Sequence, residues 1–134
     1  MAAEQGLTHI AITDINNTSA CLNSIRLAPR YDIQPIIGID FRSKQNQQLY
    51  VGLARNNKGY KQLNQHLSQH LHSDTPLPHI APLMSDTFII YPFSHYNRQR
   101  PLCENEFLGI TLADINRLAF ASNAVAQDKM VLLH

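Results

Sequence analysis

Two aspartates stand where the sequence predicts that strands end. Asp14 follows the apolar run of residues 8–13, and Asp40 lies near the end of the run 35–41. The carboxyl ends of parallel strands meet at one edge of a sheet, so paired carboxylates there could hold a metal ion or carry out acid–base chemistry. The pattern alone favours a simpler interpretation, in which Asp14 caps the turn over residues 14–17 and Asp40 is a solvated residue at a strand end.

Three histidines lie close together on a predicted helix over residues 58–72. His66 and His70 are four residues apart, a spacing at which two imidazoles can bind one ion, and His72 follows them. No glutamate lies between them as in an HExxH motif, and no third ligand is near in sequence. We therefore expect an exposed polar face rather than a metal site. His9, at the start of a strand, could be a buried histidine with satisfied hydrogen bonds.

Other motifs that carry chemistry are absent from the sequence. The glycines form neither a GxGxxG nor a GxxxxGK[ST] phosphate loop, and no GxSxG nucleophile elbow occurs. Cys21 and Cys103 are far apart and form no CxxC pair, which is typical of a protein of the reducing cytoplasm. Cys21 falls on the predicted inward face of a helix, where we expect it to pack in the core.

Composition excludes several classes of protein. The chain has 134 residues, of which 44% are hydrophobic, enough for the core of one domain. Its formal net charge of +1 argues against a self-sufficient module for binding duplex DNA, which would carry a basic excess. The sequence has no apolar run long enough to cross a membrane and no signal-peptide pattern at its start.

Hydrophobic periodicity predicts an α/β chain in which strands and helices alternate. The expected strands cover residues 8–13, 35–41, 49–54, 87–91, 106–110 and 129–133. Helices are expected over residues 19–28, 58–72 with Asn57 as its cap, and a short one from Thr111 or Asp114 to Leu118. The two longer helices have apolar faces that we expect to be inward, made of Cys21, Leu22, Ile25 and Ala28, and of Tyr60, Leu63, Leu67 and Leu71. The aromatic residues expected in the core are Tyr50, Tyr60, Phe88, Tyr91 and Phe107.

Both ends of the chain have the pattern of a cut domain. Residues 2–6 are typical of the last turn of a helix closed by Gly6, and the last predicted strand runs to the terminal His134. An incomplete sheet exposes strand edges and apolar faces, so we expect the chain to self-associate as a dimer or larger assembly.

Three segments in order resemble a known domain. Residues 6–17, GLTHIAITDINN, residues 33–41, IQPIIGIDF, and residues 53–63, LARNNKGYKQL, are similar to the "TDH-x-N", "I-K-P-I-x-G-x-E-F" and "L-A-x-N-x-x-G-Y-x-N-L" segments of the PHP domain (polymerase and histidinol phosphatase). The resemblance is to the branch that opens the alpha subunit of bacterial DNA polymerase III. It covers residues 1–72 well, leaves 73–82 as a proline-rich linker, and is weak over 83–134.

The resemblance implies a fold and a set of partners. The fold is an incomplete portion of a distorted (β/α)7 barrel with mostly parallel strands, lacking the family's first strand and its HxH metal motif. The implied partners are the remainder of the polymerase alpha subunit and a proofreading exonuclease subunit, with DNA reached only through the parent protein. Nucleotide addition would need carboxylates outside this chain.

Departures from the family pattern bear on chemistry. The resemblance implies that a metal-ligating histidine follows "T-D", where this chain has Ile15, and that a metal-bridging glutamate stands where it has the shorter Asp40. The later strand that supplies another ligand histidine reads Phe107 to Thr111, without such a donor. We therefore expect a degenerate domain with a structural or docking role, Asp40 as a vestigial ligand, and no cofactor; an intact site would take Zn or Mn.

Two alternatives remain open from the sequence. The first is a metal-dependent phosphoesterase or 3′–5′ exonuclease of the wider PHP group, using Asp40, ligands from a missing strand, and a histidine such as His95 or His134. The second is a free-standing interaction module with no catalytic descent.

Overall fold

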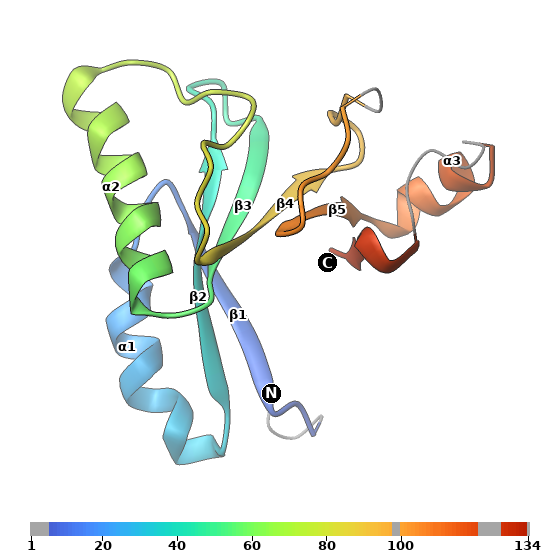
Figure 1. The fold of residues 1–134 in the computed structure, drawn as a ribbon. Coiled ribbons are helices and arrows are strands. Elements are labelled where there is room, and N and C mark those ends of the chain that lie inside the picture. Colours follow the sequence, from blue (N-terminus) through green and yellow to red (C-terminus); the bar gives the residue numbers. More distant parts are fainter. Residues whose placement is uncertain (1–5, 98–99, 121–126, 134) are drawn as a thin grey trace.

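The described part of the chain forms one curled, open sheet flanked by helices (Figure 1). The computed structural model describes residues 6–97, 100–120 and 127–133. The strands lie side by side in chain order and are β1 (His9–Ile15), β2 (Gln34–Arg42), β3 (Gln48–Ala54), β4 (Thr87–Pro92), β5 (Glu106–Ile110) and β6 (Met130–Leu132). This mixed α/β arrangement, a partial barrel, confirms the expected fold class.

Two long helices cover the same side of the first three strands (Figure 1). They are α1 (Ser19–Leu27) and α2 (Asn57–Ser73), and α1 continues into the short 3-10 helix η2 (Ala28–Tyr31). The remaining helical segments are η3 (Leu112–Asp114), α3 (Ile115–Phe120) and η4 (Gln127–Lys129). None of the helices in the described ranges combines the length and the apolar character that crossing a membrane requires.

Strand direction decides which residues share an edge of the sheet. β1 and β2 are parallel and joined across α1, and β4, β5 and β6 are parallel to one another. β3 is antiparallel to both of its neighbours. The turn over residues 43–47, which joins it to β2, is too short for a crossover. The ends of β1, β2, β4 and β5 and the start of β3 therefore lie at the same edge.

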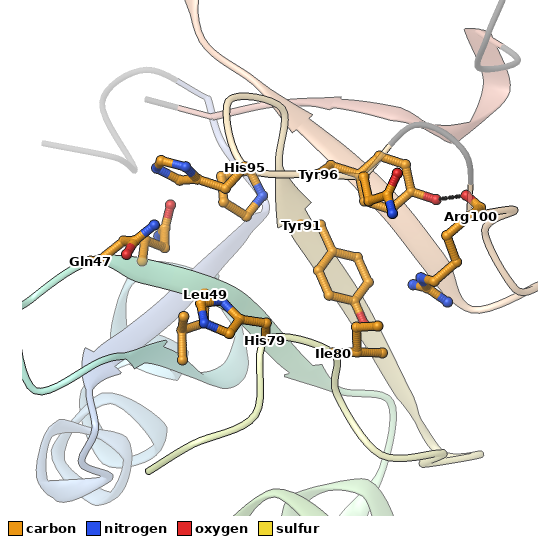
Figure 2. A pocket seen from close by; sticks show the side chains of 11 residues that line it. Gln47, Leu49, His79, Ile80, Tyr91, His95, Tyr96 and Arg100 are labelled. Atoms are coloured by element: carbon orange, nitrogen blue, oxygen red, sulfur yellow. Dashed lines mark hydrogen bonds between the residues drawn. The ribbon is translucent and has the colours of Figure 1, made fainter.

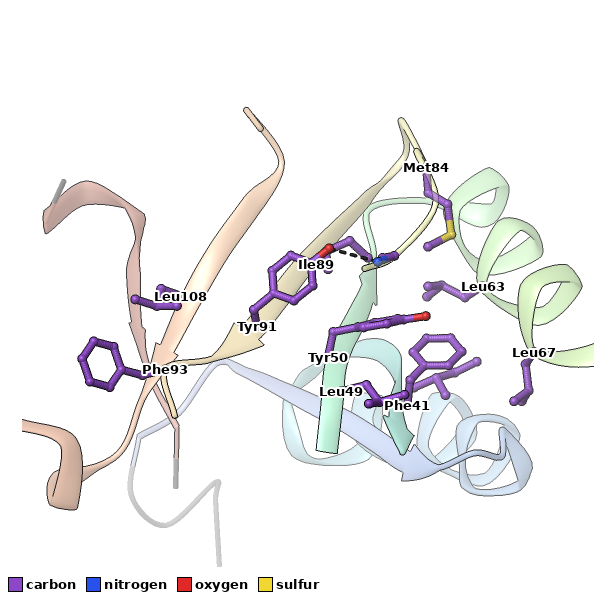
Figure 3. Close-up of a cluster of buried hydrophobic side chains, with 12 residues drawn as sticks. Phe41, Leu49, Tyr50, Leu63, Leu67, Met84, Ile89, Tyr91, Phe93 and Leu108 are labelled. Carbon is purple, nitrogen blue, oxygen red and sulfur yellow. Dashed lines mark hydrogen bonds between the residues drawn. The ribbon is translucent and has the colours of Figure 1, made fainter. Parts of the chain in front are cut away.

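The core lies between α2 and the sheet (Figure 3). Ile39, Phe41 and Tyr50 from the strands meet Leu63 and Leu67 from the helix, and all are buried. The rings of Phe41 and Tyr50 lie 5.0 Å apart between centroids. The stripe predicted for this helix is confirmed at its centre.

Parts of the predicted helical faces are wrong. On α1, Cys21 is buried as expected, but Leu22 and Ile25 are 70% and 50% exposed. The helix meets the described sheet along the Cys21 side alone, so the neighbouring apolar side chains face outward. On α2, Leu71 is also exposed because the helix runs past the core at its last turn.

Two further expectations change. Asn56, not Asn57, caps α2, since its Oδ1 accepts hydrogen bonds from the backbone N–H groups of Lys58 and Gly59. Among the aromatic residues expected in the core, Tyr50 and Tyr91 are buried. Phe88 is 36% exposed, and its ring packs edge-on against Phe107. Successive residues of a strand point to opposite faces, so Phe88 cannot join the core that contains Ile89. The helical turn expected over residues 2–6 falls largely on residues 1–5, outside the described ranges.

A substitution at Gly59 tests the close contact between α2 and Asp86, the residue before β4. In most helices Gly→Ala stabilises by about 1 kcal/mol, but here an added Cβ would lie 1.9 Å from the backbone oxygen of Asp86. We predict that Gly59→Ala lowers the free energy of unfolding by roughly 2 kcal/mol, the range for overpacking, measured by urea denaturation. Gln65→Ala, at an exposed position on the same helix, is the control. An unchanged or raised stability of Gly59→Ala would contradict the contact.

Candidate functional site

Asp40 lies at the shared edge of the sheet, beside the isoleucine that departs from the family pattern. In the register of β1 and β2, Ile15 is the partner of Asp40. Directly paired residues of neighbouring strands present their side chains to the same face. The position next to the carboxylate therefore holds a side chain with no lone pair to offer a metal ion.

The Asp40 carboxylate is buried and fully engaged by its own chain. Only 6% of the residue is exposed, so the expectation of a solvated strand-end residue is wrong. Arg42 Nε donates to Oδ2 at 2.9 Å, a terminal guanidinium nitrogen forms an ion pair with the same oxygen at 2.8 Å, and Gln48 Nε2 donates to Oδ1 at 2.9 Å. A guanidinium and an amide thus satisfy both carboxylate oxygens.

An asparagine fixes the main chain of Arg42 beside an irregularity in the strand pairing. The pairing of β2 and β3 shifts between Phe41 and Arg42, so that Leu49 of β3 has no partner in the register. The side chain of Asn16 binds the main chain of Arg42 twice: Nδ2 donates to its carbonyl at 2.8 Å, and Oδ1 accepts from its N–H at 2.9 Å. Asn16 has φ 46°, a left-handed conformation that asparagine tolerates better than most residues.

Sequence reasoning missed Arg42 and Gln48. A signal was available, because residues two apart on a strand share a face, and Asp40 and Arg42 have that spacing in a predicted strand. Gln48 carried no comparable signal, since its approach to Asp40 depends on the hairpin and its bulge.

Asp14 has a different role from Asp40. Its Oδ2 accepts a hydrogen bond of 2.7 Å from the N–H of Ala20, in the first turn of α1. Its register partner is Ile39, so it points to the opposite face from Asp40. The structure therefore does not bring the two carboxylates together, and Asp14 acts on the helix start. Burial and then the charge of Asp14 raise the pKa of the nearby Cys21 thiol, which keeps it protonated and unreactive.

The histidines of α2 do not form the exposed face that we expected. His66 is buried, and its Nε2 lies 2.7 Å from the hydroxyl of Tyr50. Its ring meets that of His70 edge-on at 4.8 Å. His70 Nδ1 contacts Thr75 Oγ1 at 3.0 Å, and His72 Nδ1 contacts the carbonyl of Ser68 at 2.8 Å. His66 is therefore part of the core: it lies on the buried side of α2 with Leu63 and Leu67, and its ring contacts Tyr50.

The residues at this edge do not fit a metal centre. Asp40 already has a positively charged partner, and Ile15 offers no donor. Across the described ranges, no three histidine, cysteine, aspartate or glutamate side chains are grouped so that they could hold an ion. His9, suggested as a buried histidine, is exposed at the start of β1, where its ring contacts the adjacent Thr8.

A cavity of about 170 Å³ lies between the start of β3 and the end of β4 (Figure 2). Gln48 belongs both to its lining and to the hydrogen bonds of Asp40. The rings of Tyr91 and Tyr96 form one wall, and the Arg100 guanidinium lies 5.1 Å and 5.8 Å from their centroids. His79 and His95 also line it. The sequence offered His95 only as a ligand in the phosphoesterase alternative, and it assigned no role to His79.

A second buried carboxylate supports that wall. Glu106 accepts from the hydroxyl of Tyr91 at 3.1 Å, from Arg100 at 2.9 Å and from the N–H of Cys103 at 2.8 Å. Burial alone would raise the pKa of Glu106, but these hydrogen bonds and the charge of Arg100 outweigh it and hold the pKa below its usual value. Glu106 is therefore a structural anion that fixes the tyrosine and the arginine.

Comparison with known proteins identifies the family. Residues 1–121 match the PHP domain, so the chain belongs to the PHP family, whose superfamily is of the metal-dependent phosphoesterase type. No curated protein matches the chain closely enough to count as a relative. The family and the partial barrel agree with each other, whereas the ion pair at Asp40 sets this chain apart from a metal-binding site.

The buried His66 makes stability depend on pH. Burial, and then the charge of His70, lower the pKa of His66 from 6.5 to about 4. The unfolded chain then binds more protons between these values, so stability is lost as pH falls from about 6.5 to 4. We predict a loss of about 2 kcal/mol between pH 7 and pH 4.5 from this residue, measured by urea denaturation. His66→Gln removes most of that dependence, while His72→Gln, at an exposed site, retains it; equal slopes in all three proteins would contradict the assignment.

Proposed function

We propose that this chain is part of the PHP domain of a bacterial DNA polymerase III alpha subunit and acts there as a scaffold and docking surface rather than as a hydrolase. One observation carries the proposal: Asp40 is neutralised by Arg42, and its strand partner is Ile15. A catalytic zinc-type centre needs about three protein ligands and an open position, and this edge supplies an ion pair instead.

The polymerase assignment rests on the three sequence segments and on the extent of the family match. All three segments lie within residues 1–121. They form β1 with the turn after it, most of β2, and the end of β3 with the first part of α2, so all three belong to one continuous part of the fold. The formal net charge of +1 supports packing against protein more than direct contact with DNA.

Exposed apolar side chains support the docking role. Along α1 and η2, Leu22, Ile25, Leu27 and Tyr31 are each about half exposed or more. Leu22 and Ile25, three residues apart, share one face of α1, and exposed apolar side chains that adjoin in this way are typical of contact with another protein segment. The remainder of the alpha subunit is the partner that we propose for this face, and a proofreading exonuclease subunit is a further one.

The alternative is a metal-dependent phosphoesterase or 3′–5′ exonuclease. The position of His95 favours it. His95 follows β4 at the same edge of the sheet and lines the cavity that Gln48 also lines, and Gln48 donates a hydrogen bond to Asp40. This alternative needs Asp40 to leave Arg42 and bind metal with donors from outside the described residues. His134, the other candidate, lies outside those residues.

Hydrolysis of p-nitrophenyl phosphate separates the two functions. With millimolar MnCl₂ or ZnCl₂, we predict no hydrolysis above that of the metal salt alone, because no open metal position is available beside Asp40. His95→Gln and Asp40→Asn are expected to match the unmodified chain. Turnover that needs metal and is lost in both variants would establish the hydrolase instead.

The native polypeptide tests the polymerase assignment. An antibody against this chain should isolate from cells a much larger polypeptide that extends DNA primers, because the proposal places these residues within the alpha subunit. The measurements are the mass of the captured polypeptide and primer extension by the captured material. A captured polypeptide without polymerase activity would contradict the assignment and favour an interaction module.

A further inference from the structure

We propose that the cluster around Asp40 is a cation site whose occupant is the protein's own Arg42 guanidinium. This inference rests on the proposed function and deepens it: it names the group that takes the place of a metal ion at this edge of the sheet, and its test reads stability and metal binding rather than enzymatic activity. It starts from the disagreement between a family of metal-dependent phosphoesterase type and an edge of the sheet that does not fit a metal.

The first step is charge balance. The Asp40 side chain is 8% exposed, and a buried carboxylate is costly unless a positive group and hydrogen bonds compensate it. Within the described residues, the ion pair of Asp40 is with Arg42. Lys44, the next cation along the chain, reaches away to the exposed Asp74 at 2.7 Å. The compensating charge is therefore specific to Arg42.

The second step is the set of oxygens around the guanidinium. Asp40 Oδ2 accepts a hydrogen bond from Nε and lies 2.8 Å from one terminal nitrogen, and Asn46 Oδ1 accepts from the other terminal nitrogen at 3.3 Å. Carboxylate and amide oxygens are the donors that hard divalent cations such as Mg²⁺ and Mn²⁺ take, often with only one or two protein ligands and several waters. The guanidinium thus lies among oxygen donors of the kind that suit a small cation.

The third step is that the chain is shaped to hold Arg42 there. Asn16 binds the arginine main chain through two hydrogen bonds, and Arg42 lies two residues from Asp40 on one strand, so the two side chains share a face. Asn16 and Asn46 both have positive φ, at 46° and 63°. Two asparagines from different loops therefore contact one arginine, one at its main chain and the other at its guanidinium.

The test replaces the arginine and offers a metal ion in its place. Arg42→Ala leaves Asp40 buried without a positive partner, so the folding equilibrium constant should fall roughly tenfold to a hundredfold, measured by urea denaturation. Millimolar MnCl₂ should then raise the melting temperature of Arg42→Ala by several degrees, since an ion that binds only the folded state stabilises it. The unmodified chain should show no such rise, because Arg42 fills the site.

Two further variants isolate the charge. Asp40→Asn/Arg42→Ala removes both partners, so it should recover most of the lost stability and not respond to MnCl₂. Lys44→Ala, which breaks the exposed pair with Asp74, should change the folding constant less than about threefold.

Three results would overturn the inference: Arg42→Ala no more damaging than Lys44→Ala, no effect of MnCl₂ on Arg42→Ala, or an equal effect on all the proteins. None of them bears on phosphatase or polymerase activity, so the proposed function would be judged separately.

Discussion

The ion pair between Asp40 and Arg42 is the constraint on which the edge of this sheet depends. A carboxylate with 6% exposure must have a counter-charge, and here the counter-charge lies two residues further along the same strand. The surrounding chain follows from that need. Asn16 holds the arginine main chain, and Gln48 satisfies the second carboxylate oxygen.

This arrangement changes the role of the edge at which α/β folds commonly carry out chemistry. In a metal-binding site the carboxylate is kept available and the neighbouring strand supplies another donor. In this protein Ile15 occupies the neighbouring position, and the carboxylate binds Arg42 on its own strand and links β2 to β3 through Gln48. The same kind of residue in the same part of a barrel thus stabilises the fold instead of binding an ion. The second buried carboxylate, Glu106, repeats this use of an acid–arginine pair at the start of β5.

Much of the fold could be predicted from the sequence, because local patterns decide it. Alternating and 3.6-residue periodicity located each strand and the two long helices to within a few residues. Exposure was harder. Leu22 and Ile25 follow the apolar pattern of α1 yet lie outward, since periodicity marks an apolar face without saying what covers it. His66 shows the opposite case, a polar residue drawn inward by a hydrogen bond to Tyr50 that no local pattern reveals.

The candidate site was predictable only in part, for a similar reason. Asp40 stood out by residue type and position. The residues around it come from separate parts of the chain, Gln48 from the β2–β3 hairpin and Asn16 from the turn after β1, so only the tertiary structure brings them together. The most direct measurement of the central claim is a crystal structure of the unmodified chain in MnCl₂, with anomalous diffraction recorded to locate manganese. The account predicts the Arg42 guanidinium against Asp40 and no manganese peak there; a peak beside Ile15 and Asp40, with Arg42 turned away, would contradict it.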